Sequence, residues 1–517
     1  MSKLRTIRIL LKLLPLILTL RKDRREWVRK QGKNIKVERY QKNARKVLNT
    51  FVSLGPVYIK LGQWLSSRAD ILPQPYMEEL AKLQDDVPAA PFDQVRPIIE
   101  KDLGPLEQNF DYINTNVISG ASLGQVYLAK IKEKDVVVKV RRPNIDKIVE
   151  EDISILKKII PVAMKFVDPN LRFSAEAMLA QFIETIHEEM DYRIELENLK
   201  TIKRNLRSYP KVIIPSVIDD HSTEQVLTME YIPGIKITNV KALDDIGLDR
   251  AQLVVRVHKV FFTMLLHHNI FHADPHPGNI SVANDGSLIL YDFGMVGKLD
   301  HETRLKLIRL YLSLVEKDPP RTVNAMDELG MLLPGFNRSI IEKGIAMSIQ
   351  TMHGIKVDKM EVKALMELAN KTMSRFPFKL PKHLSLYMRM ASILEGIYHT
   401  HKVNFRFINV LQNILEEENL IKDAYIEELK ISLNKFTKSV NDIFAIAPEL
   451  KQYLEEKRSF QNQPQKSSRN IFLSGSILSA AVFIGSTVLY GSNQLGGELG
   501  MIGSMIIMLA AVLMREH

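Results

Sequence analysis

Residues 271–294 read FHADPHPGNISVANDGSLILYDFG, and this stretch decides the fold. Asp274 and Asn279 are separated by four residues, and Asp292 follows Asn279 after 13 positions. The intervening sequence has short apolar runs on either side of NDG (284–286), which is typical of a β-hairpin. Such a hairpin returns the chain to its start, so we expect Asn279 and Asp292 to converge on one Mg²⁺ ion with hard oxygen ligands.

A lysine precedes this stretch, as it does in the order of motifs in protein kinases. Lys139 ends the β-branched run VVVK (136–139), which follows a small-residue loop, ISGASLG (118–124), and the expected strand QVYLAKI (125–131). A lysine in that place can hold the α and β phosphates of a nucleotide, although such a residue alone is more often a solvated strand end. Together with the aspartate, asparagine, hairpin and DFG that follow, it predicts nucleotide binding.

The segment IHEEMDYRIELENL (186–199) supplies carboxylates for that lysine. We expect Glu195 to pair with Lys139. On one continuous helix, at 100° per residue, Asp191 and Glu195 would share a face and Glu189 would lie far round from them. The segment would then present carboxylates in two directions.

A third expected strand, VLTMEY (226–231), ends at Pro233 and Gly234, a natural hinge. Glu230 and Ile232 lie at this hinge, and we expect them to contact the nucleotide. The chain between 147 and 207, and again from the hinge to about 450, is otherwise mostly helical in pattern.

The stretch YIKLGQWLSSRAD (58–70) places Lys60 and Gln63 three residues apart on one helix face. Gly62 between them costs about 1 kcal/mol relative to alanine. A solvated polar stripe is one interpretation. The other is that Gly62 permits a close approach and that the two polar side chains have partners elsewhere in the chain.

Composition limits the remaining alternatives. With 517 residues, 45% hydrophobic and 25% charged, the chain can form two or three globular domains. It contains no cysteine, which excludes disulfides, thiolate metal sites and a cysteine nucleophile.

Positive charge is concentrated at the start of the chain. Residues 1–46 carry 16 Lys and Arg against 3 Asp and Glu, a net of +13, so the rest of a chain of net charge +11 carries −2. The apolar run within 3–30 is about 14 residues long, interrupted by Arg8 and Lys12, and too short to span a bilayer. We expect an interfacial amphipathic helix with Trp27 nearby, rather than a targeting peptide, and no nucleic-acid partner.

The other end of the chain has a different pattern. IFLSGSILSAAVFIGSTVLY (471–490) and LGMIGSMIIMLAAVLM (499–514) contain no charged residue and flank a glycine-rich turn, which predicts a transmembrane hairpin. Lys466 and Arg469 before the first span place both ends in the cytoplasm. Small residues at four-residue spacing would allow the spans to form a homodimer.

These motifs, in this order, resemble the UbiB family, also called AarF or ADCK proteins, which are atypical protein-kinase-like proteins linked to coenzyme Q and other isoprenoid lipids. The resemblance rests on KLGQ (60–63), SGASLGQVY (119–127), VVVKV (136–140), EMDYRIE (189–195), HADPHPGN (272–279) and DFG (292–294). The chain departs from ordinary protein kinases because it lacks GxGxxG, has Ala273 in place of the HRD arginine, and leaves no room for an activation loop after DFG.

The resemblance implies a bilobal kinase-like α+β fold that binds ATP or ADP with Mg²⁺ and hydrolyses ATP under stimulation by membranes or lipid-like ligands. By matching motifs, Lys139 and Glu195 would form the ion pair at the phosphates, Asp274 would be the catalytic-loop aspartate, and Asn279 and Asp292 would be the metal ligands.

Two further groups of residues are implied by the same resemblance. Ala121 and Ser122 match a family loop of three alanines and a serine and would contact the nucleotide, whereas Gly120 departs from it and makes the loop more flexible. The KLGQ helix would form a regulatory lid. Its residues and their acidic counterparts are Lys60, Gln63, Glu189 and Asp191.

The expected organisation is a basic amphipathic membrane-surface arm at 1–46, a helical KLGQ extension at 47–110, a kinase-like N-lobe at 111–232, a C-lobe at 233–455, a polar linker at 456–470 and a transmembrane hairpin at 471–514. The expected function is a membrane-attached ATPase of a bacterial cytoplasmic membrane, with its kinase-like domain in the cytoplasm. Its expected partners are membrane lipids, isoprenoid or quinone precursors and quinone-biosynthesis proteins. The alternative is a non-catalytic scaffold that responds to nucleotide.

Overall fold

The computed structural model describes residues 3–30, 35–66, 68, 71–83, 88–120, 122–164, 169–332, 335–350, 381–403, 414–415, 421–428 and 479. The chain divides into two compact units, residues 1–307 with 313–418, and residues 308–312 with 419–517. The candidate site and the N-terminal helix lie in the first unit. Within the described residues, no helix combines the length and the apolar character needed to cross a bilayer. The predicted linker and hairpin at 456–514 lie outside those residues except for Ser479.

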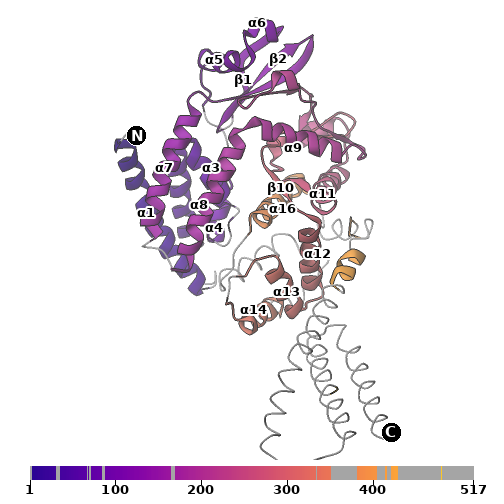
Figure 1. Cartoon of the computed structure of the whole chain (residues 1–517). Coiled ribbons are helices and arrows are strands. Elements are labelled where there is room, and N and C mark those ends of the chain that lie inside the picture. The colour runs from indigo at the N-terminus through magenta and orange to yellow at the C-terminus, as the bar shows by residue number, and fades with distance from the viewer. Residues whose placement is uncertain are drawn as a thin grey trace, which may run out of the picture. The chain divides into compact units, whose positions relative to one another are not determined.

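An antiparallel sheet of four strands forms the upper part of this unit in Figure 1, in the order β1-β2-β3-β5. Its strands are β1 (Tyr112–Gly120), β2 (Gly124–Ile131), β3 (Lys134–Arg141) and β5 (Val226–Glu230). The β2 and β3 strands and the β5 strand were predicted from their β-branched runs, and the structure confirms them. The β1 strand differs from the prediction, because the sequence pattern predicts a loop from Ile118 whereas the strand continues to Gly120.

The alternation of side chains along β3 explains why Lys139 faces the site. Val136, Val138 and Val140 are fully buried in an apolar cluster on one face of the sheet. Lys139, between the last two, therefore points to the opposite face. The apolar face is covered by α5 (Phe92–Leu103), whose Val95 contributes to the same cluster.

Below the sheet, a second set of elements includes the long helix α11 (Arg250–His267), which is buried along most of its length. The short strands here are β4 (Val212–Ile213), β6 (Ile235–Lys236), β7 (Ile270–His272), β8 (Ile280–Val282), β9 (Leu288–Leu290) and β10 (Val296–Lys298). The helices are α10 (Val240–Asp245), α12 (His301–Val315), α13 (Pro319–Glu328), α14 (Arg338–Gln350) and α16 (Lys382–His401). The predicted hairpin is confirmed: β8 pairs antiparallel with β9, and Gly286 in the turn has φ of 80°.

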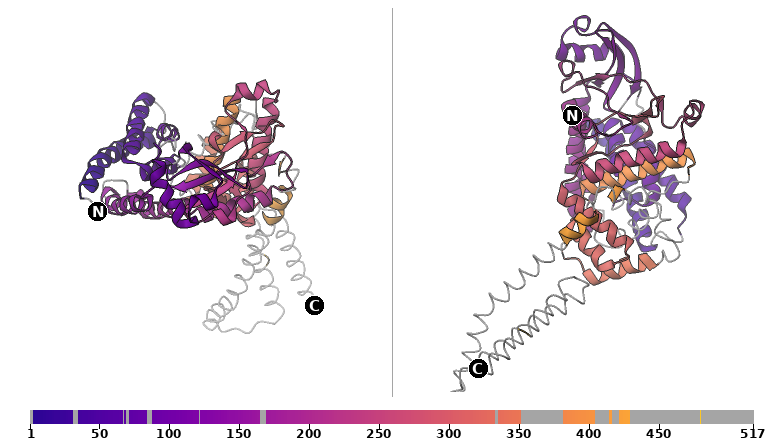
Figure 2. Two further views of the ribbon diagram at one scale, coloured as in Figure 1. Left: turned by 90° about the horizontal axis from the view of Figure 1, so that it is seen from above. Right: turned by 90° about the vertical axis from the view of Figure 1, so that its right-hand side faces the viewer.

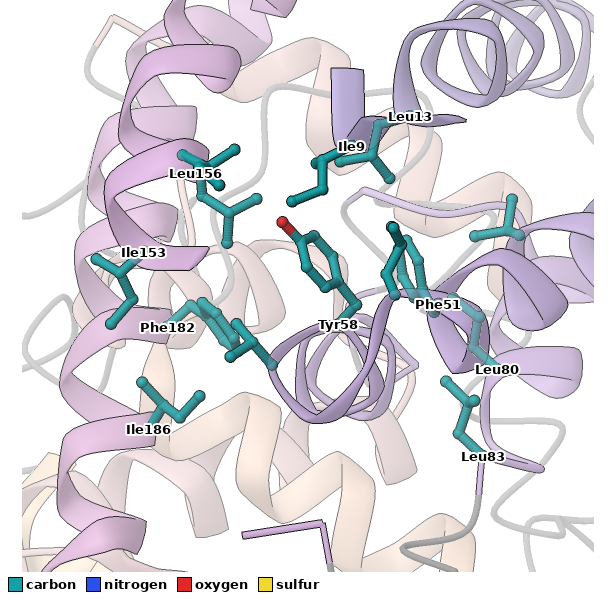
Figure 3. Packing of buried hydrophobic residues seen from close by; sticks show 14 of the residues in the cluster. Ile9, Leu13, Phe51, Tyr58, Leu80, Leu83, Ile153, Leu156, Phe182 and Ile186 are labelled. Atoms are coloured by element: carbon teal, nitrogen blue, oxygen red, sulfur yellow. The ribbon is translucent and has the colours of Figure 1, made fainter. Parts of the chain in front are cut away.

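The third part is a helical cluster that joins the predicted N-terminal arm and the start of the predicted extension to residues 145–190, which were expected in the N-lobe. Its helices are α1 (Lys3–Lys30), α2 (Val37–Leu54), α3 (Pro56–Leu65), α4 (Gln74–Leu80), α7 (Ile145–Met164) and α8 (Pro169–Met190). Their apolar side chains meet around Tyr58, with Ile9 and Leu13 on one side and Phe182 on another (Figure 3). By contrast, α5 and α6 (Leu106–Asn109) pack on the sheet, so the expected 47–110 extension is divided between two cores.

The N-terminal helix, predicted as a membrane-surface arm, packs into the core of the helical cluster. Ile9 and Leu13 are buried in the core of the helical cluster, and Arg5 binds the buried carboxylate of Asp152 on α7 through two hydrogen bonds of 2.9 and 2.7 Å. Trp27, expected near a membrane, packs edge-on against Tyr40 instead, with 5.6 Å between ring centroids. One face of the helix is thus committed to the fold.

Replacing Arg5 by alanine is expected to destabilise this helical cluster by about 2 kcal/mol or more, because it leaves the charge of Asp152 buried without its partner. The measurement is the free energy of unfolding, obtained by denaturant titration. Arg8→Ala is the matched control, since Arg8 is exposed on the same helix and its replacement is expected to change this free energy by less than about 0.5 kcal/mol. Equal free energies of unfolding for the two variants would show that α1 does not depend on this ion pair.

Candidate functional site

Three charged side chains from three separate segments meet beneath the sheet. Lys139 of β3 places its Nζ 3.0 and 2.8 Å from the two carboxylate oxygens of Glu195, on α9 (Tyr192–Asn205), and 3.4 Å from Oδ1 of Asp292. The Lys139–Glu195 pair expected from the sequence is therefore present, and Asp292 joins it. Asp292 has φ of 53°, a left-handed conformation that aims its side chain from the hairpin toward this pair.

The mutual attraction of these groups governs their charge. Burial opposes ionisation of Lys139, but the negative charges of Asp292 and Glu195 outweigh it and raise its pKa well above 10.5. The Asp292 side chain is 46% exposed; its partial desolvation would raise its pKa, but the positive charges of Lys139 and Lys60 lower it to about 2. Because this pKa lies below the ordinary value, ionised Asp292 stabilises the fold above about pH 4, and that contribution is lost as the pH falls toward 2.

The segment that supplies Glu195 differs from the single helix we expected. The α8 helix ends at Met190 and α9 begins at Tyr192, and Asp191 lies between them as the N-cap of α9. The Asp191 carboxylate accepts a hydrogen bond of 3.0 Å from the backbone N–H of Arg193 and pairs with the Arg193 side chain. Asp191 and Glu195 therefore do not share a face of one continuous helix, although Glu195 is the partner of Lys139 as expected.

The predicted catalytic loop, HADPHPGN (272–279), continues from β7 into a short 3-10 turn, Pro277–Asn279. The amide of Asn279 donates to the Asp274 carbonyl oxygen at 3.2 Å, and the Asn279 carbonyl oxygen accepts from the backbone N–H of Tyr291 at 2.9 Å. The β8–β9 hairpin thus brings Asn279 and Asp292 to the same end of the sheet, as its length predicted.

These two residues suit Mg²⁺ bound with phosphates. Among the described residues, no group of three or more His, Asp and Glu side chains is arranged as a metal site. Mg²⁺ in nucleotide sites takes only one or two protein oxygen ligands and fills its remaining positions with phosphate and water, which matches Asn279 and Asp292. A Cβ atom added at Gly294 would lie 3.2 Å from Oδ1 of Asp292, so glycine keeps the space beside this ligand open.

Asp274 has a partner that sequence reasoning missed. Arg389 of α16 donates from one guanidinium nitrogen to Oδ1 of Asp274 at 3.1 Å and from another to the Gln63 carbonyl oxygen at 3.1 Å. One side chain thus links the catalytic loop to the KLGQ helix. The only sequence signal was Ala273 in place of the usual HRD arginine, which shows that a cation is missing locally but not that position 389 supplies one.

The KLGQ helix, α3, is held from two directions. Lys60 pairs with Glu189 of α8 at 2.7 Å, and the Gln63 amide donates to the Leu83 carbonyl oxygen at 3.2 Å. A Cβ atom at Gly62 would lie 2.3 Å from Cδ1 of Leu83, so the predicted close approach is confirmed, although side chains rather than backbone make it. The solvated-stripe interpretation is wrong. Of the two expected acidic counterparts, Glu189 lies against Lys60, while Asp191 caps α9.

Besides Lys139, four residues are expected to contact the nucleotide, two in the loop before β2 and two at the hinge where β5 ends. Ser122 is fully buried, and its hydroxyl has no hydrogen-bond partner among the described residues, which leaves a polar atom for a ligand to satisfy. Glu230 accepts a hydrogen bond of 3.2 Å from the Ser216 backbone N–H, and the Ile232 carbonyl oxygen accepts one of 2.6 Å from the Tyr291 hydroxyl. Ala121 lies outside the described residues.

Comparison with known proteins places this geometry in a family. Residues 82–326 match the model of the ABC1 atypical kinase-like domain. The chain is 34% identical over 378 residues to the uncharacterized protein sll1770 of Synechocystis, covering 72% of this chain and 65% of that protein. It is 30% identical over 391 residues to the uncharacterized protein sll0095 of the same organism, covering 73% and 68%.

A plant relative carries a descriptive name. The chain is 32% identical over 435 residues to the chloroplastic protein ACTIVITY OF BC1 COMPLEX KINASE 8 of Arabidopsis thaliana, covering 77% of this chain and 57% of that protein. The chain thus spans less than two thirds of the length of this relative and of sll1770. With its domain match, its motifs in order and its kinase-like α+β fold, the chain belongs to the ABC1 atypical kinase-like family, the family also called UbiB or ADCK.

Proposed function

We propose that this chain binds ATP with Mg²⁺ beneath its four-stranded sheet and hydrolyses it while attached to a membrane. The observation that carries the proposal is the Lys139–Glu195 ion pair with Asp292 at 3.4 Å from the same lysine. A lysine held in this way can bind phosphate oxygens, and Asp292 and Asn279 can hold the ion that neutralises the phosphates when it is bound.

The remaining residues fit a restrained hydrolase. Asp274 would orient an attacking water or hydroxyl group, which is the part played by the aspartate of a kinase catalytic loop. In the present structure one of its oxygens is bound by Arg389, whose other nitrogen binds the KLGQ helix. A substrate that approaches Asp274 would therefore compete with Arg389, and this favours water or a small lipid-linked substrate over a protein chain.

The biological setting is proposed from the family. We infer that the hydrolysis supports the biosynthesis or extraction of isoprenoid quinone lipids, of the ubiquinone or menaquinone type, at a bacterial cytoplasmic membrane. Membrane lipids, quinone precursors and quinone-biosynthesis proteins are the proposed partners, and a homodimer through the C-terminal segments is a further proposal. The basic N-terminal helix supports contact with an anionic surface.

One observation also favours the second candidate, a nucleotide-responsive scaffold. Arg389 already neutralises Asp274 and also binds the Gln63 carbonyl oxygen on α3. Nucleotide binding beside Asp274 can therefore change the position of α3 without any chemical step. The two candidates differ in one measurement. Under the scaffold hypothesis, MgATP raises the melting temperature but no phosphate is released under any lipid condition.

The test of the proposed setting is metabolite profiling of a deletion strain complemented with the wild-type chain or with Asp292→Asn. We expect the deletion to lower one isoprenoid quinone and to accumulate its precursors, and only the wild-type chain to reverse this. Unchanged quinone and isoprenoid pools in the deletion strain would contradict the proposed pathway. Full rescue by Asp292→Asn would instead contradict hydrolysis and support the scaffold.

Lys60→Ala is expected to strengthen the binding of Mg²⁺ with nucleotide by about threefold, because Lys60 is a positive charge close enough to lower the pKa of Asp292 and so opposes a second cation there. The measurement is a titration of Mg²⁺ at fixed ADP. Lys46→Ala is the control, because Lys46 is exposed on α2 in the same helical cluster. Unaltered Mg²⁺ and nucleotide affinity would show that Lys60 has no influence on the site.

A further inference from the structure

The outward face of α1 is not used by the proposed site. At 100° per residue the buried Ile9 and Leu13 lie opposite a continuous stripe of exposed side chains. The exposed members in order along the helix are Ile7, Leu11, Leu18, Lys22, Arg25 and Arg29. The stripe is apolar for its first half and basic for its second half.

The apolar half is unusually exposed for large side chains. Ile7, Leu11 and Leu18 have 56%, 66% and 44% of their surface exposed, and they follow one another at helical spacing on one side of the helix. Scattered exposed leucines are ordinary on a protein surface, whereas aligned ones mark a contact surface. In Figures 1 and 2 the helix lies at the outer edge of the helical cluster, which agrees with the exposure of these side chains.

The basic half forms a shallow groove of about 440 Å³. It is lined by Leu18, Arg21, Lys22, Arg25, Glu26 and Arg29. Glu26 is already bound by Lys30 and Arg39. Within the part of the chain that the structure describes, Arg21, Lys22, Arg25 and Arg29 form no ion pair, so the groove offers four cationic side chains to an anion.

The opposite face of α1 fixes the orientation of this stripe. The Arg5–Asp152 pair and the burial of Ile9 and Leu13 hold the helix against α2 and α7. Most amphipathic membrane helices must fold when they bind, but this one is already formed and presents its outward face. Binding therefore does not require the loss of conformational entropy that folding of the segment would cause.

We propose that the outward face of α1 docks on an anionic phospholipid bilayer, with residues 7–18 at the boundary between headgroups and acyl chains and residues 21–29 on the lipid phosphates. The inference deepens the proposed membrane attachment, on which it rests, by naming the surface and the lipid charge it requires. Aligned apolar side chains do not suit nucleic acid, and four unpaired cations do not suit a second copy of the same basic helix.

The absence of cysteine from the chain permits a direct test. Leu11→Cys, labelled with an environment-sensitive fluorophore such as NBD, is reconstituted as the full chain into vesicles of phosphatidylcholine alone or of phosphatidylcholine with phosphatidylglycerol. We expect a blue shift of the emission only in the anionic vesicles, with reversal at high salt. The readout involves no nucleotide, so it can fail or succeed independently of ATP hydrolysis.

Two further variants sharpen the result. Changing Arg21, Lys22, Arg25 and Arg29 together to glutamine in the labelled chain is expected to reduce the membrane-embedded fraction of the probe by about tenfold or more. A label at Tyr112→Cys, on the exposed start of β1, is the control and should not shift. An unshifted probe at Leu11 in both vesicles, a shift of equal size in both, or a shift that depends on protein concentration without vesicles would each overturn the proposal.

Discussion

Asp292→Asn is expected to reduce Mg²⁺-dependent ATP hydrolysis by about 100-fold, measured as phosphate release in the presence of anionic vesicles. The substitution keeps the shape of the side chain and removes the charge that faces Lys139 and the predicted metal position. The stability of the fold should change little, by about 1 kcal/mol or less, because the Asp292 side chain is 46% exposed and the Lys139–Glu195 pair remains.

Asp245→Asn serves as the matched control for this experiment. Asp245 lies exposed on α10, away from the site, and its replacement by asparagine is the same chemical change. It should hydrolyse ATP at the wild-type rate. If Asp292→Asn and Asp245→Asn turned over ATP equally, then Asp292 would not hold the catalytic metal, and the proposed hydrolysis would have to be abandoned or moved elsewhere.

Lys139→Met is expected to have the largest effect on stability, lowering the free energy of unfolding by about 3 kcal/mol or more. The Glu195 side chain is only 4% exposed, so the variant leaves a buried carboxylate without its cation. Burial already favours the protonated form of Glu195 and raises its pKa, so loss of the lysine will raise that pKa further and oblige the group to take up a proton. Denaturant unfolding at neutral pH measures the loss.

A second substitution separates the structural effect from the functional one. Lys139→Met combined with Glu195→Leu removes both charges, so most of the lost stability should return while nucleotide affinity stays low. Lys200→Met, which affects an exposed lysine paired with Asp219, should cost less than about 1 kcal/mol. Recovery of nucleotide binding in the double variant would show that the pair is purely structural.

The local parts of the site could be predicted from the sequence because each is encoded within a few residues. The β8–β9 hairpin follows from its turn residues, and the hairpin alone brings Asn279 to Asp292. The orientation of Lys139 follows from the alternation of valines on β3. The pairing with Glu195 needed only a nearby carboxylate that could be brought to the strand.

The parts that the sequence did not reveal depend on contacts between distant segments. Arg389 lies 115 residues from Asp274, and no local pattern relates the two. The packing of α1 was missed for a similar reason: its buried and exposed faces both contain leucine and isoleucine, so hydrophobicity alone could not show which side joins the core. The division of the 47–110 segment between two cores likewise appears only when the sheet and the helical cluster are both present.

The break at Asp191 has a mechanical consequence. Glu189, just before it, holds Lys60 of the KLGQ helix, and Glu195, just after it, holds Lys139. The two lysines are 79 positions apart in the chain, on α3 and β3, yet their partners are six residues apart on consecutive helices joined at a single capping residue. A tilt of α8, imposed from the helical cluster, would therefore be transmitted as a rotation of α9. Because Glu195 lies less than two helical turns from Glu189, this rotation would shift Lys139, the lysine proposed to bind the phosphates.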